Sequence, residues 1–253
     1  MSGKRIMVIG EKETFLIRIL IKKLKDAGLE CGYVQNTVDA INSAWEGTGL
    51  VTYYLEEGAK PGDGAFQFLK DRMMEEDVQM ILIGENNDLR NFCDNMPGDL
   101  IYRSLVRPVD HEEYIHSVTE YFKKAASGEF KKTILIVDDD PSFLGLVREW
   151  LKDAYKVAMA NSGLQALKWL GKNKADLILL DYEMPVTSGP QVLEMLRSDE
   201  ETKSIPVMFL TGKGDKESVM AVVALKPEGY FLKTIEREKL LQKLGDFFRG
   251  LRV

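Results

Sequence analysis

Short apolar runs alternate with amphipathic segments through the second half of the chain. Runs of strand length lie at 133–138, 155–160, 175–181, 206–212 and 229–233. They are almost wholly apolar rather than alternating, which is typical of strands covered by helices on both faces. Apolar residues at helical spacing predict helices over 141–154, 162–173, 189–199, 215–225 and 236–251. Strand-and-helix units with right-handed crossovers predict a doubly wound parallel sheet, although other α/β folds share this periodicity.

The first half of the chain repeats this pattern. RIMVIGEKETF at 5–15 aligns with TILIVDDDPSF at 133–143 at an offset of 128. MILIGEN at 80–86 aligns with MFLTGKG at 208–214 at the same offset, or at 127 if Gly84 is set against Thr211. A repeat this long indicates tandem domains rather than a solenoid. We therefore expect two doubly wound, five-stranded α/β domains, at 1–125 and 131–253, joined by a polar linker within 123–132.

Length and composition suit two globular domains in one chain of 253 residues, of which 45% are hydrophobic and 29% charged. The net charge is −6, and an acidic chain without runs of like charge is a poor ligand for nucleic acids or anionic membranes. No stretch resembles a signal peptide or a membrane span, and Cys31 and Cys93 lack metal-type spacing. We expect a cytoplasmic protein with neither nucleic-acid nor membrane partners.

Polar side chains end the strands of the second half. Asp138 and Asp139 follow the first strand, Asp181 ends the third, and Thr211 and Lys233 end the fourth and fifth. In an open parallel sheet, function gathers at the carboxyl ends of the strands, where the winding reverses. Taken singly, each residue has a structural explanation as a helix cap, a turn residue or a solvated lysine. Their coincidence at converging strand ends favours a site.

The residue types indicate phosphoryl chemistry with a metal ion. Crowded carboxylates persist in the ionised form only when a cation neutralises them. Oxygen ligands with room for water suit Mg²⁺ better than zinc or copper. A carboxylate beside the metal could attack phosphorus to form an acyl phosphate, while a lysine and a threonine offset charge on the transferring oxygens. Asp140, one residue further on, is expected to start a helix.

Residues 131–253 resemble a response-regulator receiver domain of two-component signalling over their full length. The pieces that carry the resemblance are ILIVDDDP, LILLDYEMP, MFLTGKG and YFLK. It implies that Asp181 is the phosphoacceptor and that Asp138, Asp139 and Asp181 bind Mg²⁺ together with the backbone carbonyl of Glu183.

The resemblance also implies a conformational switch. Thr211 and Tyr230 would form the switch pair, and Lys233 would contact the phosphoryl group. Gly212 fits the small residue usual after the switch threonine. One departure concerns Thr234, because a proline usually follows the lysine in such families and often fixes a cis bond there.

The first half, by contrast, resembles the same fold but lacks the residues of the phosphorylation site. Gly10 and Glu11 replace the acidic pair, and Tyr54, or Tyr53 if the register slips by one, stands where Asp181 does. Gly84 and Arg107 replace the threonine and the lysine. A phenol cannot form an aspartyl phosphate, so we expect a pseudo-receiver. It serves either as a docking or regulatory module or only as a structural remnant.

These expectations describe a response regulator that takes a phosphoryl group from a histidine kinase or a histidine phosphotransfer protein. We expect no output domain after Val253, so signalling would pass through a downstream effector protein or a homodimer. The contact would use the face formed by the fourth helix, fifth strand and fifth helix of the second domain. No enzymatic activity is expected beyond self-catalysed aspartyl phosphorylation and dephosphorylation.

Three alternatives remain open at this point. In a phosphatase of the haloacid dehalogenase type, Asp138 would be the nucleophile, which leaves the run from Asp181 to Pro185 unexplained. A receiver-like scaffold would never be phosphorylated. Finally, His111 or His116 could carry a phosphoryl group, although the capping-box spacing of Asp110 and Glu113 favours an ordinary first helical turn around His111.

Overall fold

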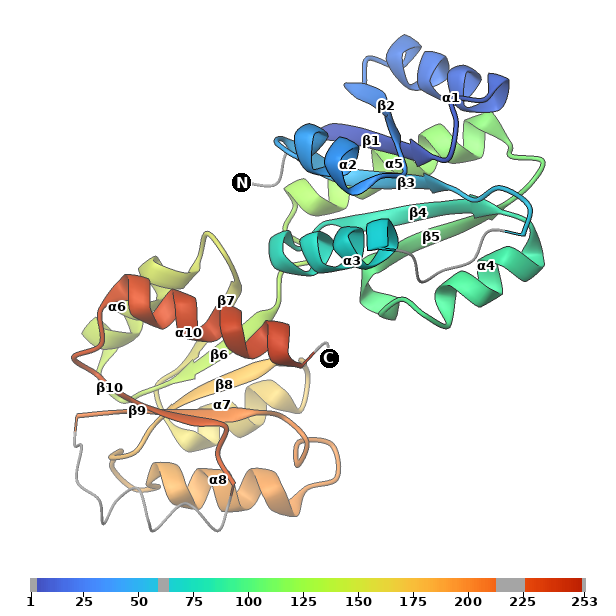
Figure 1. Cartoon of the computed structure of the whole chain (residues 1–253). Coiled ribbons are helices and arrows are strands. Elements are labelled where there is room, and N and C mark those ends of the chain that lie inside the picture. Colours follow the sequence, from blue (N-terminus) through green and yellow to red (C-terminus); the bar gives the residue numbers. More distant parts are fainter. Residues whose placement is uncertain (1–3, 59–63, 213–225, 252–253) are drawn as a thin grey trace. The chain divides into compact units, whose positions relative to one another are not determined.

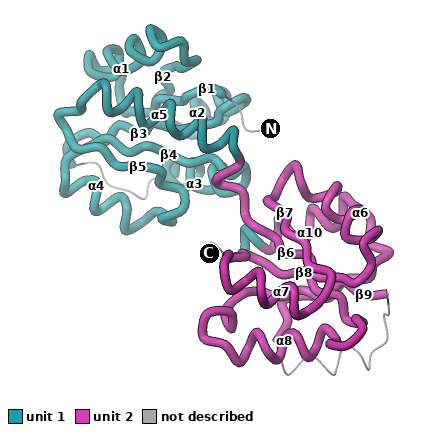
Figure 2. The backbone as a smooth tube through the Cα atoms, turned by 180° about the vertical axis from the view of Figure 1, so that it is seen from behind, with its two compact units in different colours: residues 1–127, 248–253 teal, residues 128–247 magenta. Residues whose placement is uncertain are grey.

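The computed structural model describes residues 4–58, 64–212 and 226–251. The chain divides into two compact units, residues 1–127 with 248–253 and residues 128–247 (Figure 2). Each unit contains a five-stranded sheet with flanking helices (Figure 1). Within the described ranges, no helix is long and apolar enough to cross a membrane.

The first unit alternates strands and helices along the chain. Its strands are β1 (Arg5–Gly10), β2 (Cys31–Gln35), β3 (Thr48–Tyr54), β4 (Gln79–Gly84) and β5 (Ile101–Val106). Its helices are α1 (Phe15–Asp26), α2 (Val38–Ala44), α3 (Gly64–Glu76), α4 (Asn86–Cys93), the short 3₁₀ helix η1 (Gly98–Leu100) and α5 (His111–Ala126). The strands are parallel, in the order β2-β1-β3-β4-β5.

Side chains that accept backbone N–H groups start several of these helices. Thr14 accepts from Ile17 at the start of α1, and Asp110 accepts from Glu112 and Glu113 at the start of α5. Such caps satisfy N–H groups that have no partner within the helix. His111 is therefore the first residue of α5.

Two hydrophobic clusters pack on opposite faces of the first sheet. Met7 and Ile9 of β1 belong to one cluster, and Ile6 and Val8 belong to the other. This separation follows from the strand period of two residues, which sends successive side chains to opposite faces. Because both faces are buried, the strand residues are mostly apolar, and the buried Thr52 of β3 is a polar exception.

The second unit has the same architecture. Its strands are β6 (Thr133–Val137), β7 (Lys156–Ala160), β8 (Leu177–Asp181), β9 (Val207–Thr211) and β10 (Gly229–Leu232). Its described helices are α6 (Pro141–Leu151), α7 (Gly163–Leu170), α8 (Gly189–Ser198) and α10 (Arg237–Gly250). The strands are again parallel, in the order β10-β9-β8-β6-β7.

The predicted doubly wound parallel sheet is confirmed. Strand β6 lies between β7 and β8, so the chain winds outward from β6 in both directions. The carboxyl ends of β6 and β8 therefore meet where the winding reverses, which is the position at which open α/β sheets place their sites.

The ends of the predicted elements differ from the observed ends by up to three residues. The helix expected over 141–154 ends at Leu151, because Ala154 and Tyr155 donate to the carbonyl of Leu151 in a closing turn. The helix expected over 162–173 ends at Leu170, with Gly171 as its cap. The helix expected over 215–225 lies outside the described residues.

Candidate functional site

Three carboxylates meet at the carboxyl edge of the second sheet. Asp138 directly follows β6, and Asp181 is the last residue of β8. Their side chains are nearly inaccessible, since Asp138 is 1% and Asp181 3% exposed, whereas Asp139 faces solvent. One oxygen from each of the three carboxylates lies within 4.8 Å of the others. The structure thus brings together the acidic residues that the sequence placed on different strands.

Lys233, which follows β10, reaches into this cluster. Its Nζ atom lies 2.7 Å from Oδ2 of Asp138 and 3.0 Å from Oδ2 of Asp181. The same ammonium stands 4.9 Å from the centre of the Phe143 ring, a favourable distance for a cation–π contact. The backbone N–H of Lys233 donates to the carbonyl of Thr211 at 2.8 Å. This bond extends the pairing of β9 and β10 to the site.

The turn after β6 is shaped by the acidic residues themselves. Asp138 Oδ1 accepts a hydrogen bond from the backbone N–H of Asp140 at 2.9 Å. Asp140 in turn accepts from Ser142 at 2.8 Å and caps α6, whose first residue is Pro141. The expectation that Asp140 starts a helix is confirmed. Because Asp140 is used as a cap, the cluster consists of the other two aspartates of the run together with Asp181.

Burial and charge act in opposite directions on Asp181. Burial raises the pKa of the Asp181 carboxyl, and the nearby Asp138 carboxylate raises it further. The hydrogen bond from Lys233 and the backbone N–H of Glu183 oppose this rise, but the pKa stays above its ordinary value. Burial alone would lower the pKa of Lys233, yet its bonds to Asp138 and Asp181 outweigh that effect and raise it. The ammonium is therefore held in its charged form.

The donor set fits a hard divalent cation. Three ionised carboxylates carry three negative charges, and Lys233 supplies one positive charge. Two of these carboxylates are buried, where uncompensated charge is costly. Oxygen-only ligands of this kind suit Mg²⁺ or Mn²⁺ rather than metals that prefer sulfur or nitrogen.

Thr211 and Tyr230 lie on one face of the second sheet. Tyr230 pairs with Phe209, and Leu232 pairs with Thr211. Because side chains repeat their direction every two residues, Phe209, Thr211 and Tyr230 share a face. Thr211 is completely buried, and the Tyr230 ring is half-buried against Phe209 with 5.8 Å between ring centres. The two residues expected to form a switch therefore occupy neighbouring strands with a common orientation.

The loop after β8 and the first residue of α8 bring backbone unusually close to the site. A Cβ atom on Gly189 would lie 2.1 Å from the carbonyl oxygen of Asp181, so only glycine fits there. Three residues earlier, Val186 has φ of 71°, and its side chain is fully exposed. A β-branched residue in this left-handed region is strained. The segment from Val186 to Gly189 thus combines local strain with close approach to Asp181.

Phe143 and Gly189 were not identified as site residues from the sequence. Phe143 has helical spacing with the apolar residues of α6, which explains it equally well as a core residue. Gly189 stands before Pro190 at the start of a helix, where glycine has no special signature. The one sequence feature that could have identified Gly189 is its spacing of eight residues from Asp181. That spacing has no meaning until the fold is known.

Strand registers in the first unit identify the residues at the corresponding positions. Ile9 pairs with Tyr53 as Val137 pairs with Leu180, which places Tyr54 rather than Tyr53 in register with Asp181. Tyr54 pairs with Ile83 as Asp181 pairs with Leu210, so Gly84 corresponds to Thr211. The offset of 127, and not 128, therefore holds for β4. By the same comparison, Arg107 corresponds to Lys233.

In the first unit, neighbouring side chains fill the space beside two of these replacements. A Cβ atom on Gly84 would lie 3.0 Å from Cβ of Leu55, whose side chain is buried in the space beside it. A Cβ atom on Gly10 would lie 2.6 Å from Cδ1 of Ile17. Glu11 pairs with the side-chain amide of Asn36 at 2.7 Å. Among the described residues, no cluster of three metal-ligating side chains lies in this unit.

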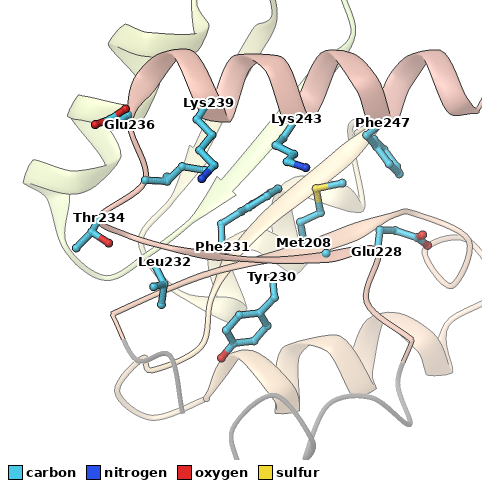
Figure 3. A pocket seen from close by; sticks show the side chains of 12 residues that line it. Met208, Glu228, Tyr230, Phe231, Leu232, Thr234, Glu236, Lys239, Lys243 and Phe247 are labelled. Carbon is cyan, nitrogen blue, oxygen red and sulfur yellow. The ribbon is translucent and has the colours of Figure 1, made fainter. Parts of the chain in front are cut away.

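A separate pocket of about 860 Å³ lies along β10 and α10 of the second unit (Figure 3). Figure 3 shows Lys239 and Lys243 of α10 extending toward Phe231 and Met208, with Phe247 at one end. Tyr230 leaves β10 on the opposite side from Phe231. Strand β10, which lines this pocket, therefore also carries Tyr230 of the expected switch pair.

Fold and site together define a doubly wound α/β domain with an acidic cluster and a lysine at the carboxyl edge of its sheet, and comparison with known proteins identifies the family. Residues 134–245 match the family described as the response regulator receiver domain. The chain is 32% identical over 120 residues to the chemotaxis protein CheY-3 of Vibrio cholerae, covering 92% of that protein and 47% of this chain. This chain belongs to the response-regulator receiver family.

Two further similarities have different coverage. A probable cyclic di-GMP phosphodiesterase of Vibrio cholerae is 38% identical over 103 residues, which is 41% of this chain but only 23% of that protein. The crystal structure of the Vibrio cholerae chemotaxis protein CheY4 is 31% identical, covers 46% of this chain and 98% of its own, and has a TM-score of 0.44.

Proposed function

We propose that the second unit is a phosphoacceptor of a two-component phosphorelay, with Asp181 as the residue that is phosphorylated. The observation that carries the proposal is the buried Asp181 carboxylate, held among two further carboxylates and the Lys233 ammonium. The donor would be a histidine kinase or a histidine phosphotransfer protein, and the chemistry would be limited to formation and hydrolysis of the aspartyl phosphate.

In the transfer step, a carboxylate oxygen of Asp181 forms a bond to the phosphorus atom of the donor. The bond between that phosphorus and the donor nitrogen breaks, and its electron pair returns to the donor imidazole. The product is an acyl phosphate on Asp181, which water hydrolyses later. Because the attacking group must be ionised, the raised pKa of Asp181 has to be offset by positive charge at the site.

Two sources of positive charge are available. Mg²⁺, held by Asp138, Asp139, Asp181 and the backbone carbonyl of Glu183, would neutralise charge on the transferring oxygens when bound. Lys233 already contacts Asp138 and Asp181, so its ammonium needs only a small movement to follow a phosphoryl group placed on Asp181. The hydroxyl of Thr211 would donate to a further phosphoryl oxygen.

Phosphorylation would then be sensed by Thr211 and Tyr230. A Thr211 hydroxyl drawn toward the phosphoryl group would leave space on the face it shares with Tyr230, whose ring would turn inward. The change biases an existing equilibrium and needs only a few kcal/mol of differential stabilisation. The surface on β10 and α10 would present the result to an effector protein or to a second copy of the chain (Figure 3).

The first unit would not be phosphorylated. Tyr54 has no carboxylate to offer, and Leu55 occupies space beside the glycine that corresponds to Thr211. We propose that this unit is a docking or regulatory module for the second one.

The test is phosphorylation of the full chain by acetyl phosphate with Mg²⁺, followed by intact mass spectrometry. The wild-type chain should gain the mass of one phosphoryl group, and chelation of the metal should abolish the gain. Asp181→Asn should gain none. Asp176→Asn is the matched control, because Asp176 is a half-exposed aspartate immediately before β8, at the opposite end of that strand.

Labelling of Asp181→Asn to the wild-type extent would contradict the proposal. Absence of Mg²⁺-dependent labelling from both the wild-type chain and Asp176→Asn would contradict it as well, and would favour a scaffold that is never phosphorylated.

A further inference from the structure

A cavity of about 450 Å³ lies in the first unit at the carboxyl ends of β3, β4 and β5. Leu16 and Leu20 of α1 form one wall, and Val109 lies near the start of α5. Tyr54 and Arg107 supply an aromatic ring and a cation. The volume falls in the range of small-molecule sites, which are mostly apolar with a few polar groups that orient the ligand.

Arg107 is the cationic side chain most suited to a ligand in this cavity. Its side chain is 20% exposed, and its guanidinium carbon stands 5.5 Å from the centre of the Tyr54 ring. Its Nε atom lies 3.4 Å from Oε1 of Glu85, without hydrogen-bond geometry. No other side-chain partner of Arg107 occurs among the residues that the structure describes. A guanidinium has five N–H donors, so most of them remain available.

Glu85 is only a weakly held ion-pair partner of Arg107. Its side chain is 52% exposed, and a solvated ion pair of this kind contributes little stability. An incoming carboxylate could displace it and form two parallel hydrogen bonds with the guanidinium. Among the lining residues, Arg107 is the one lysine or arginine, His111 is the one further side chain that can carry a positive charge, and Glu85 stays nearby. A monoanion therefore suits the cavity better than a dianion.

We propose that this cavity binds a small organic monocarboxylate with an apolar or aromatic body. Its carboxylate would pair with Arg107 in place of Glu85, and its body would lie against Leu16, Leu20 and Val109. Tyr54 and Arg107 hold the strand positions that Asp181 and Lys233 hold in the second unit. The first unit thus retains a ligand site at the sheet edge where its sequence has lost the phosphoacceptor.

The experiment is a two-dimensional ¹H–¹⁵N NMR titration of the full chain with benzoate and with hexanoate. Benzyl alcohol and 1-hexanol serve as uncharged probes of similar shape. At least one acid should give saturable shifts of amide signals around Leu20, Glu85 and Arg107, and its alcohol should bind at least about tenfold more weakly. The site would be overturned if neither acid gives saturable shifts there, or if the alcohol binds as tightly as its acid.

Variants test the role of the guanidinium. Arg107→Gln should weaken binding of the acid at least about tenfold, whereas Arg103→Gln should leave it unchanged. Arg103 lies on β5, the strand that Arg107 follows, but it pairs with Ser117 and Glu120 and does not line the cavity. Retention of wild-type affinity in Arg107→Gln would contradict the proposal.

If Arg107→Gln does not fold, Leu16→Glu provides a second test. Leu16 is half-exposed on the cavity wall, so the substitution is compatible with folding. The added carboxylate should weaken binding of the acid more than binding of the alcohol, and equal effects on both would overturn the proposal. Asp181→Asn should bind the acid as the wild-type chain does, which separates this site from the phosphoacceptor.

Discussion

At the residue scale, Lys233 connects the acidic cluster to the end of β10. Its ammonium bridges Asp138 and Asp181, and its backbone N–H bonds to Thr211. A change in the charge of Asp181 therefore acts directly on a residue that begins the connection to α10. Thr211 lies on the neighbouring strand and is completely buried, so its movement requires rearrangement of the side chains around it.

Substitution of Thr211 tests this coupling. We expect Thr211→Ala to remain phosphorylatable, because the hydroxyl is not the nucleophile, but to respond weakly. The response is measured as the change in backbone hydrogen exchange of residues 229–232 when beryllofluoride and Mg²⁺ are added. Thr202→Ala is the matched control, since Thr202 is a buried threonine that bonds to the carbonyl of Leu196 away from the site. A full response in Thr211→Ala would refute the switch assignment.

The backbone at Val186 is strained, and substitution by glycine should relieve the strain. Its φ of 71° suits glycine, and its side chain is fully exposed. We expect Val186→Gly to raise the free energy of unfolding of the second unit by about 1 kcal/mol. Urea unfolding measures the change. Leu164→Gly, at an exposed position in α7, should instead lower it by about 1 kcal/mol. If Val186→Gly is as destabilising as Leu164→Gly, the strain is not real.

The sequence predicted which residues approach one another at the site, but not how they interact. Asp138, Asp181 and Lys233 were placed together because parallel strands end at one edge. The two contacts of one ammonium with both buried carboxylates depend on side-chain distances that no spacing encodes. The strain at Val186 and the close approach at Gly189 likewise depend on the path of a loop, whose backbone angles are set by the whole unit.

At the element scale, α5 anchors the first unit through buried tyrosines. The Tyr114 hydroxyl lies 2.8 Å from the Thr52 hydroxyl of β3 in the core. Burial raises the pKa of Tyr121 to about 12 and also raises the pKa of Tyr114. The packing of this helix therefore depends on neutral phenols.

These pKa shifts predict loss of stability in alkali. The unfolded chain releases a tyrosine proton near pH 10, whereas folded Tyr121 keeps it to about pH 12. Between these values the unfolded state binds fewer protons, so the free energy of unfolding falls as pH rises. Urea unfolding at about pH 9 and about pH 11 should show a smaller fall in Tyr121→Phe than in the wild-type chain. An equal fall in both would contradict the assignment.

The repacked strand end in the first unit gives a further prediction. We expect Gly84→Ala to lower the free energy of unfolding of this unit by about 1–3 kcal/mol, because the new methyl group meets Cβ of Leu55. Gly98→Ala is the control, since nothing lies within 4 Å of its added Cβ. Chemical unfolding compares the two. A neutral Gly84→Ala would show that the space beside Leu55 accepts an added methyl group.

Elements were predictable where the apolar pattern is continuous. The strands of the second unit match their predicted ranges within two residues because fully apolar runs have few interpretations in a sheet covered on both faces. The helix ends were less accurate, since the turn after Leu151 depends on which carbonyls remain available. The choice between Tyr53 and Tyr54 needed the strand register, which changes the face of every side chain when it slips by one.

At the scale of the whole molecule, the same sheet topology occurs in both units, but the side chains at the carboxyl edge of the sheet differ. In the second unit the edge of the sheet holds buried carboxylates and a lysine, whereas in the first it holds a tyrosine, an arginine and apolar walls. The common fold positions the residues, and the side chains at the strand ends decide what each unit does. The central claim is that phosphoryl chemistry belongs to the second unit alone.

The most direct measurement is to find which side chain carries the phosphoryl group. The full chain is phosphorylated with acetyl phosphate and Mg²⁺, the acyl phosphate is reduced with borohydride, and the modified residue is identified by peptide mass spectrometry. Our account predicts modification of Asp181 alone, with none in residues 4–58 or 64–127. Modification of Asp138, as expected for a dehalogenase-type phosphatase, or of any residue in the first unit, would contradict it.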